Sequence, residues 1–393
     1  ELMFFIGLAC AIFAQDWALQ NRPEARRLAP TFARGLAATA GVAVVLLAYP
    51  LYLQFAGPQI YHGIGFDQKV HAEDLAAYGA YPYNSLARLA GLWTKLAPNY
   101  TEETTFFGPA LLVLLVACFV VLRKRPWIRA LGVTALVFAV LSLGPYLRWW
   151  DRRTHIPLPF HLLWGLPIFD TALPARFALI VIPIAGVLLA LCLDRALTLP
   201  ARRVAGGVPW LGGRLPWLGA RRVWLAAFAV ALVPLLPLPV QAIERLPVPV
   251  FFSSGDYRKY VSEGGTLVPI PPTLDTLPDG QRWQAAAHFD FAIPQGFFLG
   301  PGPDGRSQVG PDLRPTAQIL NDAALKGTSR PITDADRAQA RVDLAYWHAQ
   351  VVVLGDGGAG ARWTPRQPLL LRLATELFGP PERVDDVWLW RVG

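Results

Sequence analysis

The chain has 393 residues, of which 53% are hydrophobic and only 16% are charged. Ordinary soluble domains carry about 25% charged residues, so this composition and a mean hydropathy of +0.35 exclude a typical soluble protein. The formal net charge is +8, but residues 1–242 hold 21 Lys and Arg against 11 Asp and Glu, while residues 243–393 hold 15 against 17. The positive excess lies in short clusters between apolar runs, as in membrane proteins. We therefore predict contact with membrane lipids and no nucleic-acid partner.

The chain opens on an apolar run directly after Glu1. This run, LMFFIGLACAIFA, has 13 residues, fewer than the roughly 20 that cross a bilayer as a helix. It has neither a basic stretch before it nor a small-residue cleavage site after it, so it does not indicate a signal peptide. We expect an N-terminally truncated sequence that begins inside a transmembrane helix.

Five further apolar segments have lengths suited to membrane-spanning helices. They are residues 35–56, 106–122, 130–147, 177–193 and 223–242. Together with the partial first segment, they predict an α-helical polytopic membrane bundle of about six spans over residues 1–242.

The loops between these segments alternate in charge. Residues 15–34, 123–129 and 194–222 are rich in Arg and Lys, whereas loops 57–105 and 148–176 together carry only seven basic residues. Because basic loops stay in the cytoplasm, we expect both other loops and everything after residue 242 to face outward. The Arg-, Ala-, Leu- and Pro-rich composition favours a bacterial source. The prediction is a multi-pass protein of the bacterial cytoplasmic (inner) membrane with an extracytoplasmic C-terminal domain.

Residues 243–393 form this second predicted domain, in which apolar runs are short and turn residues separate them. Strands are predicted at 248–252, 266–271, 350–355 and 386–392. Helices are predicted at 256–262, 335–349 and 367–378. Thr333 and Asp336 have the spacing of a capping box. The alternation of strands and helices predicts a small extracytoplasmic α/β domain, with a Gly- and Pro-rich surface loop at 294–315.

The loop 57–105 groups acidic residues with a histidine. Asp67, His71, Glu73 and Asp74 lie within eight residues. On a helix, His71 and Asp74 would share a face, where they could bind a metal or relay a proton. A solvated surface loop explains the same residues. Asp67, His71 and Asp74 are therefore candidate sugar or acceptor contacts; no cofactor is firmly implied, and a divalent metal stays an alternative.

The loop 148–176 is unusual for its arginines. They are Arg148, Arg152, Arg153 and Arg176. The WWDRR motif at 149–153 is typical of an interfacial anchor, with Trp at headgroup depth and Arg extended toward lipid phosphate. The alternative is a phosphate-binding site, because the planar guanidinium binds phosphate bidentately. Asp170, six residues before Arg176, is expected as an arginine partner, a helix cap or a ligand contact.

In the C-terminal domain, the segment RWQAAAHFDF at 282–291 combines aromatic and polar side chains. Carbohydrate sites often join an aromatic platform to amides and acids, so Trp283 and Gln284 are candidate sugar contacts. A packed strand with one solvated face explains the segment equally well. The chain has no G-x-S-x-G, H-E-x-x-H or Walker motif, which removes the sequence signatures of a serine hydrolase, a zincin or an ATPase.

Several segments carry a resemblance to a known class. They are YPLYLQFAGPQ (49–59), LSLGPYL (141–147), IPLPFHLLWGLPIFDTALPARFAL (156–179) and RWQAAAHFDF (282–291). With the expected architecture, they resemble bacterial GT-C-type membrane glycosyltransferases of actinobacterial type. YfhO-like membrane proteins are similar as well.

The resemblance implies a donor sugar linked to polyprenyl phosphate and an extracytoplasmic glycan or protein as acceptor. The catalytic carboxylate of such enzymes acts as a general base from the first outer loop, which we expect upstream of residue 1, so the catalytic residue here is unknown. Arg176, with Arg148, Arg152 or Arg153, would hold the donor phosphate.

A non-enzymatic membrane protein is the competing hypothesis: a transport or flippase-like protein, or an envelope assembly factor with a partner-binding outer domain. Transporters usually place polar residues near the middle of their spans. The predicted spans contain few polar side chains, which argues against an ion-coupled transporter.

Overall fold

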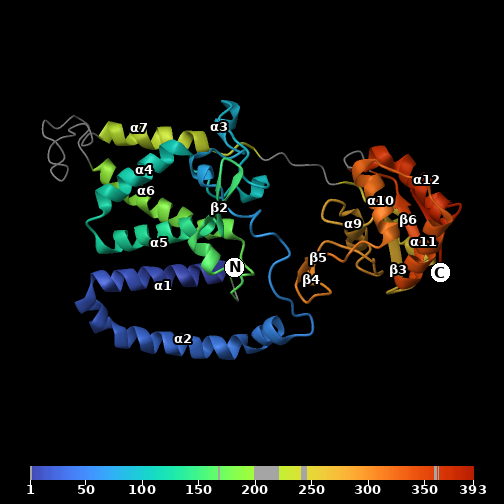
Figure 1. The fold of residues 1–393 in the computed structure, drawn as a ribbon, viewed down its shortest axis with the longest axis horizontal. Coiled ribbons are helices and arrows are strands. Elements are labelled where there is room, and N and C mark those ends of the chain that lie inside the picture. Colours follow the sequence, from blue (N-terminus) through green and yellow to red (C-terminus); the bar gives the residue numbers. More distant parts are fainter. Residues whose placement is uncertain (1, 167–168, 199–220, 240–245, 358–360, 362) are drawn as a thin grey trace. The chain divides into compact units, whose positions relative to one another are not determined.

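The computed structural model describes residues 2–166, 169–198, 221–239, 246–357, 361 and 363–393. The chain divides into two compact units, Glu1–Val240 and Gln241–Gly393. The sequence-based division lies after residue 242, close to this boundary. The first unit is helical, and the second unit combines helices with a sheet (Figure 1).

Long apolar helices make up most of the first unit. They are α1 (Leu2–Gln20), α2 (Arg22–Ala56), α4 (Gly108–Leu122), α5 (Pro126–Ser142), α6 (Val181–Leu197) and α7 (Arg221–Leu232). Within the described residues, three segments are long and apolar enough to cross a membrane, namely α1, α2 and Pro174–Leu197. The helices α4 and α5 are apolar but shorter. These features are those of a membrane-associated helical protein.

Two predicted spans end earlier than expected. The helix α5 stops at Ser142, because Gly144 has a φ of 72° and Pro145 cannot donate a helical hydrogen bond. The helix α7 stops at Leu232 and continues as the single turn η7 (Val233–Leu235), which contains a proline. Residues 240–242 of that span lie outside the described residues, as do residues 199–220 of the third basic loop.

The helices α4 to α7 pack around a common apolar core (Figure 1). The helix α1 packs against α5 and adds Phe5, which is fully buried. The helix α2 has no buried residue although its C-terminal half is apolar all round. A helix of this kind is suited to lipid, because in water its exposed apolar surface would be unfavourable.

Two irregular segments connect these helices. Between α2 and α4 lie η1 (Leu75–Gly79), α3 (Leu86–Leu89) and η2 (Tyr100–Glu102). Between α5 and α6 lie β1 (Tyr146–Trp149), β2 (Arg152–Pro157), η3 (Pro159–Leu162) and η4 (Pro174–Ile180). The strands β1 and β2 form an antiparallel hairpin.

The second unit is built on a four-stranded sheet in the order β3-β6-β8-β7. Its strands are β3 (Thr266–Ile270), β6 (Ala349–Gly355), β7 (Glu382–Val384) and β8 (Val387–Arg391). The pair β3–β6 is parallel, and the other two pairs are antiparallel. The helices α10 (Pro315–Lys326), α11 (Asp334–Tyr346) and α12 (Gln367–Phe378) pack against one another.

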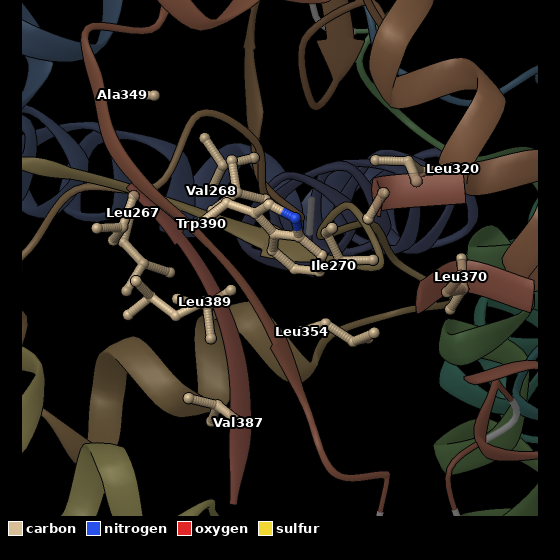
Figure 2. Close-up of a cluster of buried hydrophobic side chains, with 14 of the residues drawn as sticks. Leu267, Val268, Ile270, Leu320, Ala349, Leu354, Leu370, Val387, Leu389 and Trp390 are labelled. Atoms are coloured by element: carbon tan, nitrogen blue, oxygen red, sulfur yellow. The ribbon is translucent and has the colours of Figure 1, made fainter. Parts of the chain in front are cut away.

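The core of the second unit lies between this sheet and its helices. Figure 2 shows Leu267 and Ile270 of β3 grouped with Leu389 and Trp390 of β8. The strand β6 is buried along almost its whole length, which explains its run of consecutive β-branched residues.

Most predicted elements of this unit are confirmed, including β3, β6, β8 and α12. The capping box of α11 is present, with Thr333 and Asp336 bonded to each other's backbone. The predicted helix at 256–262 is only a short turn, η8 (Asp256–Lys259). The Gly- and Pro-rich segment 294–315 contains a small hairpin, β4 (Leu299–Pro301) with β5 (Ser307–Val309).

The predicted strand at 248–252 is wrong, because Val250–Ser253 forms the short helix α8. The carboxylate of Asp386 accepts the backbone N–H groups of Val250 at 2.7 Å and of Phe251 at 3.2 Å. Free N–H groups at a helix start favour such an acceptor. This one is distant in sequence, so the local pattern does not reveal it.

Candidate functional site

The candidate site lies in the first unit, around the β1–β2 hairpin. Trp149 faces Arg152 across the hairpin, which leaves Trp150 and Asp151 as a two-residue turn. Both turn residues have positive φ, 50° and 62°, a conformation that favours Asn and Gly. Because Trp and Asp adopt it at an energetic cost, the turn requires support from elsewhere in the chain.

Asp74 supplies that support. Its carboxylate is fully buried and accepts the backbone N–H groups of Trp150 at 3.1 Å and of Asp151 at 2.7 Å. It also accepts the N–H of Ala76 and so caps η1. The Nε of Arg148 lies 3.9 Å from Asp74 Oδ2. These partners compensate a buried charge, and they fasten residues 74–76 to the hairpin.

A cavity of about 290 Å³ opens beside the hairpin. Its lining residues are Lys69, Ala72, Pro145, Tyr146, Leu147, Arg148, Arg153, Thr154 and His155. Three of them carry a permanent positive charge and none is acidic. Such a cavity is suited to an anionic group.

The three cations differ in how far the fold neutralises them. The side chain of Arg148 is 12% exposed and forms an ion pair with Asp151, yet its Nε has no hydrogen-bond acceptor among the described residues. Lys69 lies with Nζ 4.8 Å from the centre of the Trp164 ring. Within the described part of the chain, neither Lys69 nor Arg153 has an ion pair. Their charge is therefore available to a ligand.

Arg176 and Arg152 do not line this cavity. Nη2 of Arg176 lies 3.4 Å from Glu102 Oε1, so the expected partner Asp170 is replaced by Glu102. Arg152 is exposed beside the turn. Of the four arginines expected to hold phosphate, Arg148 and Arg153 line the cavity, together with Lys69, which sequence reasoning missed.

The predicted helical face shared by His71 and Asp74 is wrong, because residues 71–74 form no helix and η1 begins at Leu75. His71 Nδ1 lies 3.0 Å from the carbonyl oxygen of Asp67. Asp67 Oδ1 accepts the N–H of Lys69, and the N–H of Asp170 donates to Leu166. Among the described residues, no group of three or more His, Cys, Asp or Glu could hold a metal ion.

Glu73 is a second residue that sequence reasoning did not single out. Its side chain is 2% exposed, and Thr104 Oγ1 donates to it at 3.0 Å. Burial raises the pKa of Glu73 to about 8, since desolvation disfavours the charged form. Glu73 is therefore mostly protonated at neutral pH. In the sequence, only its place in the acidic group next to Asp74 pointed to this residue.

Side chains of the polar–aromatic segment 282–291 pack and form hydrogen bonds within the second unit. It forms α9 (Asp279–Ala286) and the turn after it, not a strand. Trp283 is 2% exposed and stacks on Phe252, with ring centres 5.1 Å apart. Gln284 donates to the carbonyl of Phe291 at 2.8 Å. Trp283 is therefore buried, and the half-buried Gln284 bonds within its own unit.

Comparison of the chain with protein-family models, with curated proteins and with solved structures finds no match. A proposal for the function therefore rests on the residues that line the cavity beside the β1–β2 hairpin.

Proposed function

We propose that this protein is an integral membrane protein that binds the phosphate group of a polyprenyl-phosphate-linked sugar and transfers the sugar, as GT-C-type glycosyltransferases do. The cavity beside the β1–β2 hairpin carries the proposal, because Lys69, Arg148 and Arg153 line it without an acidic residue. Guanidinium and ammonium groups bind phosphate through charge-assisted hydrogen bonds. The Nε of Arg148 is a buried donor that still lacks an acceptor among the described residues.

One segment that carries the resemblance to GT-C enzymes lines this cavity and is hydrogen-bonded to a second such segment. Pro145 and Tyr146 of LSLGPYL line it, and the Pro145 carbonyl accepts the N–H of Leu158 at 3.0 Å. A Cβ added at Gly144 would lie 2.5 Å from Cβ of Ala72. The close approach and the positive φ both require glycine here. These contacts support a shared site formed by the two connecting segments.

The proposed topology places this site at the outer membrane interface. Six spans, with the three basic loops in the cytoplasm, leave both connecting segments and the second unit outside. The exposed Trp149 and Trp150 of the hairpin suit the headgroup region, where tryptophan is enriched. A lipid-linked phosphate at this depth would reach the cavity while its polyprenyl chain stays in the bilayer.

In the proposed transfer, an acceptor hydroxyl oxygen bonds to the anomeric carbon while the bond from that carbon to the phosphate oxygen breaks. The bonding electron pair stays on the phosphate, whose negative charge increases. Arg148 and Arg153 would stabilise that charge in a partly dehydrated cavity. The hydroxyl proton passes to a general base, and we assign none of the described residues to this role.

The test compares Arg153→Ala with Arg152→Ala in the full chain, reconstituted in lipid nanodiscs. Both arginines are exposed on β2, but only Arg153 lines the cavity. We expect Arg153→Ala to weaken binding of polyprenyl phosphate roughly tenfold, about 1.4 kcal/mol, and Arg152→Ala to leave it nearly unchanged. Equal affinities of the two variants would contradict the phosphate site.

A second measurement separates binding from catalysis. We expect transfer of sugar from a polyprenyl-phosphate donor to fall with Arg153→Ala in parallel with binding. If the protein binds such donors through Arg153 but leaves the sugar in place with every acceptor, the transferase assignment is wrong, and a transport, flippase-like or assembly role replaces it.

A further inference from the structure

The second unit exposes three consecutive apolar side chains at the start of the β4–β5 hairpin. Phe297, Phe298 and Leu299 are 51%, 52% and 44% exposed. None of them belongs to the buried core of this unit or packs against it. We call them the Phe297–Leu299 patch. Single exposed apolar residues are common, but a contiguous exposed apolar group is a candidate contact site.

The backbone of the patch is held in place. The N–H of Phe297 donates to Gln281 Oε1 at 3.0 Å, and the carbonyl of Phe298 accepts the N–H of Gly310 at 2.8 Å. Leu299 pairs with Val309 in the hairpin. The exposure of these side chains is therefore built into the fold.

Glycines on both sides of the patch accommodate the ring of Phe298. A Cβ added at Gly296 or Gly300 would lie 3.5 Å or 3.3 Å from the ring of Phe298. The ring thus lies close to both glycines and stays half exposed. Residues 291–303 contain no charged side chain, so the segment that carries the patch brings no charge of its own into an apolar medium.

We propose that the Phe297–Leu299 patch inserts into the lipid interface of the membrane that holds the first unit. Residues 236–249 connect the two units, and a segment of this length spans at most about 50 Å. The covalent link gives the patch a high effective concentration at the bilayer, so a few apolar side chains suffice as a second anchor.

The size of the patch favours lipid over a protein partner. A stable protein interface buries about 800 Å² on each partner, far more than three side chains provide. Interfacial insertion needs only a small apolar group that reaches the boundary between headgroups and acyl chains. The inference depends on membrane insertion of the first unit and not on the phosphate site, so the two proposals can fail separately.

The test places a fluorophore on the patch in the full chain. Cys10 is exposed and is replaced by Ser, since the other two cysteines are buried. Phe298→Cys is labelled with a polarity-sensitive dye in nanodiscs that contain lipids with quencher groups on the acyl chain. The control is Val342→Cys on α11, an apolar position of the same unit that is 55% exposed.

We expect lipid quenching at position 298 to exceed that at position 342 by roughly twofold or more. Adding Phe297→Ser and Leu299→Ser should remove the excess without changing the unfolding temperature. Equal quenching at the two positions would overturn the proposal. Protection of position 298 from aqueous iodide without lipid quenching would also overturn it, and would assign the patch to a protein contact or to a second copy.

Discussion

Two polar–aromatic regions of this protein look alike in sequence and differ in what the fold does with them. The β1–β2 hairpin, with its neighbour Lys69, leaves cations facing a cavity without acidic residues. In the segment 282–291, the carboxylate of Asp290 accepts Tyr257 Oη at 2.7 Å and forms an ion pair with Arg258. We propose that the first region binds an anion, whereas the contacts of the second lie within its own unit. The difference is that Asp290 is bonded to Tyr257 and Arg258, whereas Lys69 and Arg153 have no ion pair among the described residues.

The largest expected effect comes from Trp283. Because its side chain is buried, we expect it to stabilise the second unit. Trp283→Ala should lower the free energy of unfolding of the second unit by about 3–5 kcal/mol, because it leaves a cavity in the core. Hydrogen exchange of the β6 amides measures this change. Polyprenyl-phosphate binding should persist at conditions where the unit stays folded.

A weaker control tests the same assignment. Gln284→Ala removes one hydrogen bond to Phe291 and should cost about 1 kcal/mol. If Trp283→Ala were neutral for stability but abolished ligand binding, the contrast between the two regions would be wrong.

Asp74 should have the next largest effect, on stability and binding together. Asp74→Ala removes the acceptor for the N–H groups of Trp150 and Asp151 and a neighbour of the buried Arg148. We expect a loss of about 2–4 kcal/mol in the first unit. Phosphate binding should fall because Arg148 and Arg153 lose their fixed positions.

The matched control is Asp67→Ala, which removes an exposed carboxylate from the same segment. Thermal unfolding and phosphate affinity in nanodiscs report both effects. Similar results for the two variants would show that Asp74 does not position the hairpin.

Glu73 should have an effect on stability that depends on pH and vanishes in acid. Its pKa is raised by burial from 4.5 to about 8, so between these values the folded state retains a proton that the unfolded state has released. Stability should therefore fall as the pH rises through this range. Glu73→Gln cannot ionise and should be more stable than the original protein at pH 8, by on the order of 4 kcal/mol from the linkage relation.

At about pH 4 the two proteins should have nearly the same stability, because the glutamic acid is protonated in both states. Unfolding temperatures measured at both pH values test this expectation. A constant difference across the range would indicate a packing effect of the substitution and would remove the pH argument.

Local sequence patterns predicted elements whose stabilising contacts are local. The capping box of Thr333 and Asp336 spans three residues, and α12 follows from apolar spacing and a terminal glycine. The helix α8 was not predicted, because the acceptor for its N-terminal N–H group, Asp386, lies far away in the sequence. The helix α9 was not predicted, because the aromatic residues after RWQAAA favour a strand. In the structure the helix ends before His288 and Phe289, which have positive φ.

The sequence by itself determined the class of protein and the four candidate arginines, but not Lys69. The lengths of apolar runs and the placement of charges can be read directly from the sequence, without knowledge of tertiary contacts. They indicate a membrane-associated helical unit followed by a unit of helices and strands. Only the tertiary structure decided which candidate arginines line the cavity and which lie against a carboxylate. It places Glu102 against Arg176 and Asp151 against Arg148, but gives Arg153 no carboxylate among the described residues. The Glu102–Arg176 pair joins residues 74 positions apart in the chain, and no local pattern encodes it.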